Sequence, residues 1–340
     1  MLVNSTVMPP TLCVVIPSRD RVGTVADAIK SVLRTRRNDV QVVVVDDGSR
    51  DETFARLAEI RDPRLVSCRV KPGGANRARN IGAGLSEAPL IAFLDSDDMF
   101  TPSRIDRLIG FFAAHPSVDC LIDGFVDVSP RRTRVHRMPQ ITPSAADIRR
   151  LLLAHRLPLT NSAITVRRRA WDAVAGHDED LQLHDDRDFL LRLATSHQLC
   201  LGQATDVIKR RGPDSVSHRA TGYIAGLDAL AARYPDYHRP EYSTLFRYLV
   251  VRGIMTSLSR GHFLAAFQEF RALRAASHLP QDFLSSISCY WSGRRQRMTP
   301  VPSSVSVSWP ALTNEPPRPL SSMRPLTAPE STVSWSAPSL

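Results

Sequence analysis

Residues 90–98 are LIAFLDSDD, a run of five apolar residues followed directly by three aspartates in four positions. A short apolar run of this kind is typical of a strand that is buried on both faces. Two similar segments come before it, LCVVIPSRD at residues 12–20 and VQVVVVDDGS at residues 40–49. Stretches with helical spacing of their apolar residues follow, as at residues 22–33. This alternation predicts an α/β fold with a mostly parallel sheet and helices on both faces.

The same periodicity predicts the positions of most elements. We expect strands at residues 12–16, 40–45, 64–70 and 90–94, and helices at residues 22–33, 53–60 and 76–86. Another helix is expected to begin at Thr101-Pro102, with Thr101 as its cap and Pro102 in its first turn. Further along, we expect a strand at 164–166, helices at 168–174 and 186–195, and a strand that ends at residues 207–208.

The chain is expected to have three parts. Residues 1–220 would form the α/β domain, residues 221–295 a helical appendage, and residues 296–340 a tail rich in proline and serine. The tail has too little apolar surface to offset its ordering entropy, so we predict that it is disordered. The sequence shows no signal-peptide pattern and no apolar stretch near the roughly 20 residues of a membrane span. We therefore expect a soluble protein.

The composition is ordinary for a globular protein, with 43% hydrophobic and 23% charged residues. The formal net charge of +10 is spread over short basic runs, and no nucleic-acid-binding motif is recognisable, so we expect no nucleic-acid partner. We interpret most runs as solvated loops and helix ends; a second use could be peripheral contact with anionic lipid. The five cysteines are scattered and form no CxxC pair, which fits a reducing, cytoplasmic location.

Polar residues follow each of the first four predicted strands. In an open parallel sheet the carboxyl ends of the strands meet at one edge, where ligands bind. The segments are Pro17–Arg21, Asp46–Ser49, Gly73–Asn80 and Asp95–Asp98. Three aspartates packed together repel one another unless a cation neutralises them, and Mg²⁺ or Mn²⁺ prefers oxygen ligands from carboxylates and phosphates. The last segment therefore predicts a metal site; the alternative is an acidic turn that only caps the next helix.

The chemistry of two other segments suits a nucleotide. Asp46 or Asp47 could accept the ring N–H of a pyrimidine base, or both could belong to a solvated turn in which Gly48 takes a positive φ. Gly73–Asn80 joins flexible backbone to two arginines at a helix start, which favours a diphosphate. An ordinary loop with solvated arginines is the alternative there.

The segments VVIPSRDR, VVVVDDGS, GGANRARNIGA and FLDSDD, in this order, resemble the family 2 glycosyltransferases, which have the GT-A fold. The resemblance resumes at residues 161–194, where GHDEDLQLHDDRD is similar to the family's GGFDE…ED-x-D segment. Residues 210–217, RRGPDSVS, look like the usual end of the family's catalytic domain. The resemblance covers most of residues 12–218 and implies an enzyme that uses a nucleotide-sugar donor.

The resemblance also implies roles for the residues that bind the donor. Asp47, with Asp46 beside it, would contact the nucleotide base, and Pro17 and Arg19 would line the base pocket. Arg79 is a candidate ligand of the diphosphate.

For the metal and the chemistry, the resemblance points to three aspartates. Asp97 would be the main ligand of Mn²⁺ or Mg²⁺, and Asp95 would support the nucleotide or the metal shell. Asp186 would be the catalytic base, with Asp185 in the place of the family's glutamate. A helix N-cap is the alternative role for Asp186, and one side chain could serve as both.

The sequence departs from the family pattern at several positions. Arg19-Asp20 stands where the family often has Tyr-Asn, so an arginine plane would replace the ring that stacks on the base. His177 stands where phenylalanine is usual, and His184 precedes the acidic pair. Either histidine could shape the acceptor site, but we interpret both as ordinary surface residues. His218 could be a third metal ligand, although we favour an ordinary role for it as well.

These features predict an inverting glycosyltransferase that moves a sugar, from a UDP-sugar by preference, to a hydroxyl of a sugar, a lipid-linked sugar or a small molecule. The chain lacks the Gln-x-x-Arg-Trp motif of processive synthases, so we expect one sugar per encounter in glycan or polysaccharide biosynthesis. One alternative is a protein that binds a nucleotide sugar without turnover. A sugar-phosphate nucleotidyltransferase is a weaker alternative, because the loop Pro17–Arg21 contains no glycine.

Overall fold

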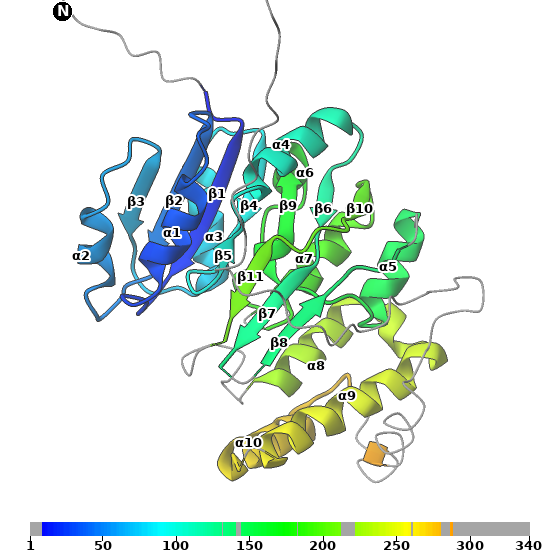
Figure 1. Cartoon of the computed structure of the whole chain (residues 1–340). Helices are drawn as coiled ribbons and strands as arrows, with labels where there is room; N and C mark the ends of the chain where they lie inside the picture. Colours follow the sequence, from blue (N-terminus) through cyan, green and yellow to red (C-terminus); the bar gives the residue numbers. More distant parts are fainter. Residues whose placement is uncertain are drawn as a thin grey trace, which may run out of the picture.

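A computed structural model describes residues 9–130, 132–140, 144–181, 183–211, 222–259, 261–279 and 286–287 of the chain. Its larger sheet has seven strands in the order β10-β6-β9-β4-β1-β2-β3 (Figure 1). The strands are β1 Leu12–Ser18, β2 Val40–Asp46, β3 Leu65–Arg69, β4 Leu90–Phe93, β6 Cys120–Ile122, β9 Ile164–Arg167 and β10 Leu199–Leu201. β9 runs antiparallel to both of its neighbours, and the other neighbouring pairs are parallel, so the sheet is mostly parallel as predicted.

Helices cover both faces of this sheet (Figure 1). They are α1 Val25–Leu33, α2 Thr53–Ala58, α3 Ala75–Gly84, α4 Arg104–Ala114, α5 Ala145–Leu153, α6 Arg168–Ala173 and α7 Asp185–Leu193, with a 3₁₀ turn, η1, at Asn161–Ala163. Successive side chains of a strand point to opposite faces, so β1 contributes to two cores. Val14 belongs to the core formed with α1 and α4, whereas Val15 belongs to the core formed with α3 and α7.

A second, four-stranded sheet has the order β5-β11-β7-β8. Its strands are β5 Met99–Phe100, β7 Phe125–Ser129, β8 Arg132–His136 and β11 Val207–Arg210. β11 pairs antiparallel with β5, which begins immediately after the acidic turn Asp95–Asp98. This pairing brings the end of β11 beside the acidic turn, although the two are far apart in the sequence.

A buried ion-pair cluster anchors β11 in place. Arg104 of α4 is fully buried, and its Nη1 lies 3.0 Å from Asp123 Oδ2. Arg107, one turn further along α4, lies 2.6 Å from Asp206, the residue that directly precedes β11. Arginine pairs of this kind are geometrically specific because the planar guanidinium offers several fixed donors. The cluster thus fixes the start of β11 relative to α4.

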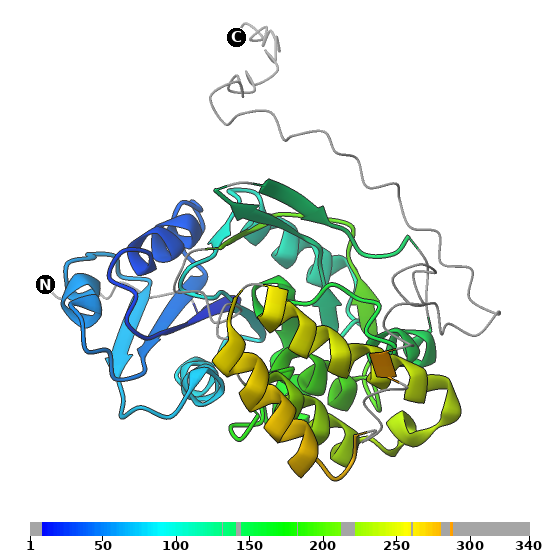
Figure 2. The same cartoon turned by 90° about the horizontal axis from the view of Figure 1, so that it is seen from below.

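The C-terminal part of the described chain is helical, with α8 Tyr223–Arg233, the 3₁₀ turn η3 Pro235–His238, α9 Pro240–Ser259 and α10 Phe263–Ala275. Figure 2 shows α9 and α10 side by side. Apolar side chains of these helices, such as Leu227, Phe246 and Leu273, belong to the same core as α5 and α7. In the described part of the chain, no helix combines the length and the apolar character that crossing a membrane requires.

Most of the predicted elements are present, with ends that differ by a few residues. The prediction that Thr101 caps a helix is wrong: its amide donates to the carbonyl of Asp206, and α4 begins only at Arg104, after Ser103. The predicted strand end at 207–208 is the beginning of β11. The predicted boundary at residue 220 and the predicted tail 296–340 lie outside the described residues.

Candidate active site

The loops that follow β1 and β2 are fastened to each other. The amide of Asp20 donates to Ser49 Oγ at 2.9 Å, and the Asp20 carboxylate accepts the amide of Arg50 at 2.7 Å. The amide of Arg21 donates to Thr53 Oγ1 at 2.7 Å. Asp20 has a φ of 52°, a conformation that aspartate adopts more readily than most residues. The two loops therefore form one fixed unit at the edge of the sheet.

Asp47 connects this double loop to the start of α3. It is buried, and its carboxylate accepts the amides of Gly73 at 2.7 Å and Gly74 at 3.0 Å. Arg19 is exposed, with Nη1 3.6 Å from the Asp47 carboxylate, and Pro17 is buried in β1. The glycine amides that were candidates for a diphosphate are thus bound to Asp47 in this structure. Base contacts by Asp47, Pro17 and Arg19 stay predictions.

Asp46 lies at the end of β2 and is fully buried. Its carboxylate accepts the hydroxyl of Ser49 and lies 3.2 Å from Nε of Arg69. Gly48 between them has the predicted positive φ, at 68°, and a Cβ there would meet Pro72 at 2.7 Å. These contacts give Asp46 a clear role in holding the turn, and its contact with a nucleotide base stays a prediction.

The three aspartates that follow β4 have different surroundings. Asp98 is fully buried and accepts Ser162 Oγ at 2.7 Å and the amide of Arg210 at 3.2 Å. Burial raises the pKa of Asp98 to about 7. Burial also raises the pKa of Asp97, and the nearby Asp95 carboxylate adds to this effect. Among the described residues, the Asp97 carboxylate has no ion-pair partner.

Lys209 of β11 lies among these carboxylates, and it lies outside the motifs of the sequence. Its Nζ is 3.6 Å from both Asp95 Oδ2 and Asp98 Oδ2, and it donates to Thr160 Oγ1 at 3.2 Å. Burial alone would lower the pKa of Lys209, but the carboxylates of Asp98, Asp95 and Asp97 raise it above its usual value. The ammonium group therefore stays charged within the acidic turn.

Arg79 of α3 joins the acidic turn to the start of α7. Its guanidinium is buried and lies 2.8 Å from Asp95 Oδ1 and 3.0 Å from Asp185 Oδ2, and it also donates to Asn76 Oδ1 at 2.8 Å. Although burial opposes ionisation, Arg79 holds the pKa of Asp95 below its usual value. Arg79 is thus a bridge between two carboxylates, and a direct contact with a diphosphate stays a prediction.

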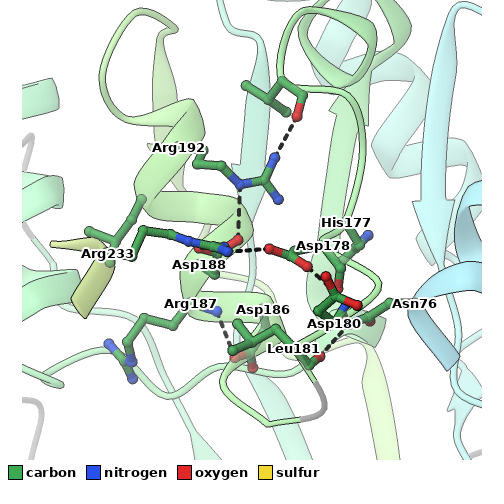
Figure 3. A network of polar contacts seen from close by, with 12 residues as sticks. Asn76, His177, Asp178, Asp180, Leu181, Asp186, Arg187, Asp188, Arg192 and Arg233 are labelled. Carbon is green, nitrogen blue, oxygen red and sulfur yellow. Dashed lines mark hydrogen bonds and ion pairs between the residues drawn. The ribbon is translucent and has the colours of Figure 1, made fainter. Parts of the chain in front are cut away.

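The two aspartates that begin α7 also differ in their hydrogen-bond and ion-pair partners. Asp185 accepts Arg79 and the amide of the Asn161 side chain, the latter at 2.9 Å. Asp186 accepts only the backbone amide of Arg187, at 2.7 Å, among the described residues (Figure 3). Burial raises the pKa of Asp186 to about 6, and the charge of Asp185 adds to the rise. Asp186 is therefore a partly buried carboxylate without a cationic partner in that part of the chain.

The segment before α7 is held by a second polar network (Figure 3). Asn76 Nδ2 donates to the carbonyls of Asp178 at 2.8 Å and Leu181 at 2.6 Å. Arg233 of α8 pairs with Asp178 and, at 2.7 Å, with the buried Asp188 of α7. Since this network joins α3, α7 and α8, it fixes the direction in which α7 presents Asp185 and Asp186.

The interpretation of His177 as a surface residue is wrong, because it is 2% exposed. Its ring stacks on Phe189 with centroids 4.6 Å apart and meets Phe93 edge-on at 5.1 Å. Its Nε2 lies 3.0 Å from Asn161 Oδ1, so His177 supports the residue that binds Asp185. Burial lowers its pKa well below the usual value, which keeps the ring neutral. The histidine thus fills the place of the family's phenylalanine and adds one hydrogen bond.

His184 is not an exposed surface residue either. It is half-buried at the position before α7, and burial lowers its pKa to about 3. Its ring contacts His155 and Tyr223, at centroid distances of 5.8 Å and 5.1 Å. His218, the other candidate, lies outside the described residues.

Two of the basic runs in the sequence, residues 167–169 and 209–211, have partners within the protein. Arg168 donates to the carbonyls of Ala83 and Ala88, and Arg169 lies 2.7 Å from Asp119. Arg211 lies 2.6 Å from Asp127. Much of the positive charge in these runs therefore balances nearby aspartates and carbonyls within the protein.

The residues of the acidic turn fit a metal ion that takes most of its ligands from a substrate. In the portion that the structure describes, no three His, Cys, Asp or Glu side chains are arranged to hold a metal. Of the three aspartates in the acidic turn, Asp97 has no ion-pair partner among the described residues, whereas Asp95 and Asp98 face Lys209. Mg²⁺ is often held by only one or two carboxylates together with substrate phosphates. Asp97 is thus the residue that would bind such an ion.

Known proteins resemble both the sequence and the fold. The profile of Glycosyl transferase family 2 matches residues 13–176. The succinoglycan biosynthesis protein ExoU of Rhizobium meliloti is 32% identical over 141 residues, which are 40% of this chain and 40% of that protein. The chain thus spans well under two thirds of this relative's length.

Two solved structures have a similar fold. TarS 1–349 of S. aureus, in complex with UDP-GlcNAc, gives a TM-score of 0.60 at 15% identity and is covered to 92%, against 84% of this chain. The mannosyltransferase PcManGT of Pyrobaculum calidifontis, in complex with GDP-Man and Mn²⁺, gives 0.52 at 14% identity, with 88% of that chain and 86% of this one covered. At these identities the similarity concerns the fold.

The mostly parallel sheet with helices on both of its faces is the GT-A fold that these solved structures share. Residues 13–176 form a domain that matches Glycosyl transferase family 2. The family and the fold predicted from the motifs are thus confirmed.

Proposed function

We propose that the protein transfers a sugar from a nucleoside diphosphate donor, a UDP-sugar, to a hydroxyl group of an acceptor, with inversion at the anomeric carbon. The observation that carries this proposal is that Arg79 binds Asp95 and Asp185, while the nearby carboxylates of Asp97 and Asp186 have no ion-pair partner among the described residues. Asp97 suits the leaving-group side, and Asp186 suits the acceptor side.

The donor would bind along the edge formed by the double loop and the acidic turn. In this proposal Asp47, Arg19 and Pro17 face the nucleotide base, and Asp97 holds Mn²⁺ or Mg²⁺ against the diphosphate. A divalent ion of this kind supplies charge neutralisation of the leaving diphosphate. The two solved structures were obtained with a UDP-sugar and a GDP-sugar, and we favour UDP because a relative that is 30% identical over 89 residues is named as a UDP-Glc glucosyltransferase. An aspartate at position 47 could accept the ring N–H of uracil.

Asp186 would take the proton from the acceptor hydroxyl. A general base works best when its pKa lies near the working pH, and burial raises the pKa of Asp186 to about 6. The backbone amide of Arg187 donates to the Asp186 carboxylate, and Arg79 and Asn161 hold the neighbouring Asp185 in place. A single base that approaches from the face opposite the leaving group gives inversion.

The acceptor would be a hydroxyl-bearing sugar or lipid-linked sugar in polysaccharide biosynthesis. The support is the relative ExoU, a succinoglycan biosynthesis protein. We place the reaction in the cytoplasm, where Cys13, Cys68, Cys120 and Cys200 would remain the free thiols that the structure shows.

The test is release of nucleoside diphosphate from a panel of UDP-, GDP- and dTDP-sugars, with and without added sugar acceptors. We expect turnover with at least one UDP-sugar and loss of that turnover in Asp186→Asn. Binding of a nucleotide sugar without transfer or hydrolysis in any combination would favour a protein that binds the donor without turnover.

We also propose that the protein contacts an anionic membrane surface through α10. Phe263, Leu264 and Phe267 of this helix are 70%, 72% and 58% exposed. Arg271 and Arg274 are exposed on the same helix, whose acidic residue, Glu269, is buried. An exposed apolar stripe next to arginines suits the boundary of an anionic bilayer.

Vesicle flotation tests this contact. Binding to vesicles that contain anionic lipid, but not to neutral vesicles, should fall in a Phe263→Ser, Phe267→Ser double variant. Equal flotation of the variant and the wild-type protein would contradict the role of α10.

A further inference from the structure

We infer that Lys209 is a fixed cation of the donor site and binds the diphosphate of the nucleotide sugar alongside the metal held by Asp97. This inference rests on the proposed function. It assigns a donor-binding role to a residue in β11, whereas the donor-binding residues implied by the motifs come from the ends of β1, β2 and β4 and from α3.

The position of Lys209 follows from the strand pairing. Ile208 lies opposite Met99 in the β5–β11 pair, and β5 follows Asp98 directly. Asp206 at the start of β11 is fixed by Arg104 and Arg107. The backbone therefore determines that residue 209 lies next to the acidic turn.

The surroundings of Lys209 show what its charge acts on. The carboxylates of Asp95 and Asp98 lie 3.6 Å from Nζ, which is longer than a direct hydrogen bond of about 2.7–3.2 Å. Thr160 is its one hydrogen-bond acceptor among the described residues, at 3.2 Å. An ammonium group has three N–H donors, so donors remain for another oxygen ligand.

The side chain of Lys209 lies at the border between the acidic turn and solvent. Its side chain is 18% exposed, so the ammonium group is neither sealed in the core nor free in solvent. A diphosphate oxygen bound next to Asp97 would therefore meet the positive charge of Lys209 beside the carboxylates of Asp95 and Asp98.

The role predicts a specific energetic signature. If Lys209 binds the diphosphate, the nucleotide should bind measurably even when the metal is removed. If Lys209 only balances Asp95 and Asp98, its loss should lower stability without changing how strongly nucleotide binding depends on metal. The ratio of the dissociation constants of UDP without and with metal distinguishes these roles.

We would titrate UDP into the full chain by calorimetry, once in EDTA and once in Mn²⁺. The wild-type protein should bind in both, and Lys209→Met should weaken the binding in EDTA by at least about tenfold, as expected for a hydrogen bond to a charged group. Lys209→Arg should restore most of it. Arg211→Met is the matched control: it removes a nearby positive charge that pairs with Asp127, and it should leave the binding unchanged.

Each outcome is decisive. Binding of UDP in EDTA that is equal, within about twofold, in Lys209→Met and the wild-type protein would overturn the inference. Wild-type binding only with Mn²⁺ would also overturn it and would leave the proposed function standing. Failure to bind UDP, GDP or dTDP under any condition would overturn both. Thermal unfolding checks each variant, and Lys209→Gln replaces Lys209→Met, under the same criteria, if the latter does not fold.

Discussion

The acidic turn after β4 and the acidic start of α7 contain the same residue type in different electrostatic settings. In the turn, two cations, Arg79 and Lys209, lie within 3.6 Å of aspartate oxygens. At the start of α7, Arg79 reaches Asp185 alone, and Asp186 has no cationic partner among the described residues. The cations in the acidic turn therefore suit it to bind a negatively charged phosphate, whereas Asp186 at the start of α7 is suited to accept a proton.

One arginine, Arg79, contacts both the acidic turn and the acidic start of α7. Arg79 fixes Asp95 and Asp185, one carboxylate of each acidic group. Asp97 and Asp186, which Arg79 does not bind, keep a raised pKa because burial disfavours their charge.

Replacing Asp186 and Asp185 one at a time tests whether the pair is divided in this way. Asp186→Asn should lower kcat by about 10²–10⁴-fold, the usual contribution of a general base, and should leave UDP binding intact. Asp185→Asn removes an ion pair with Arg79 and should lower kcat much less. Steady-state kinetics with calorimetry of both variants is the measurement. An equal loss in the two variants would mean that Asp186 is not the base.

Removing the bridge tests whether the two acidic groups are coupled. Arg79→Met removes the guanidinium that the partly buried carboxylates of Asp95 and Asp185 share. We expect the free energy of unfolding to fall by about 3–5 kcal/mol, measured by urea denaturation. Arg79→Lys should recover only part of this loss, because one ammonium cannot replace the forked guanidinium. A loss below about 1 kcal/mol for Arg79→Met would contradict the bridge.

The pH dependence of transfer tests the protonation state of Asp186. Its pKa is raised to about 6 by burial and by Asp185, against the opposing effects of Arg187 and Lys209. The base acts in its ionised form, so kcat/KM should rise about tenfold per pH unit below about pH 6 and level off above it.

A control is needed because the pKa of Asp98 is raised to about 7. Asp98→Asn removes that titration, and the rise of kcat/KM near pH 6 should remain. If this rise disappears in Asp98→Asn, the pH dependence belongs to the acidic turn and not to Asp186.

The smallest effect is expected at His177. His177→Phe keeps the ring stacked on Phe189 and loses only the bond to Asn161, so the free energy of unfolding should change by less than about 1.5 kcal/mol. His177→Ala should be clearly more destabilising, because it leaves a cavity next to Phe93 and Phe189. Thermal unfolding of both variants is the measurement. Equal losses would mean that the hydrogen bond, and not ring packing, dominates.

The part of the site that lies after consecutive strands could be predicted from the sequence. The apolar runs that end in DDGS and DSDD are local signals, and parallel strands bring their carboxyl ends together in any fold of this class. The residues that neutralise these segments could not be predicted in the same way. Lys209 was part of a basic run, and only the pairing of β11 with β5 brings it to Asp98.

The interpretation of His177 failed for a related reason. A histidine in a polar segment is usually exposed, and the sequence does not show that Phe93, Trp171 and Phe189 form an aromatic core around position 177. The segment between residues 120 and 136 was also left without predicted elements, because β6, β7 and β8 are only three to five residues long. Strands this short carry little periodicity.

The most direct test of the central claim is a calorimetric titration of UDP, with and without Mn²⁺, into the wild-type protein and Asp97→Ala. We predict that Mn²⁺ strengthens binding to the wild-type protein and has no such effect on the variant. The same Mn²⁺ effect in both proteins would contradict the role of Asp97. Failure of the wild-type protein to bind UDP, GDP or dTDP would contradict a nucleotide-sugar site at this edge of the sheet.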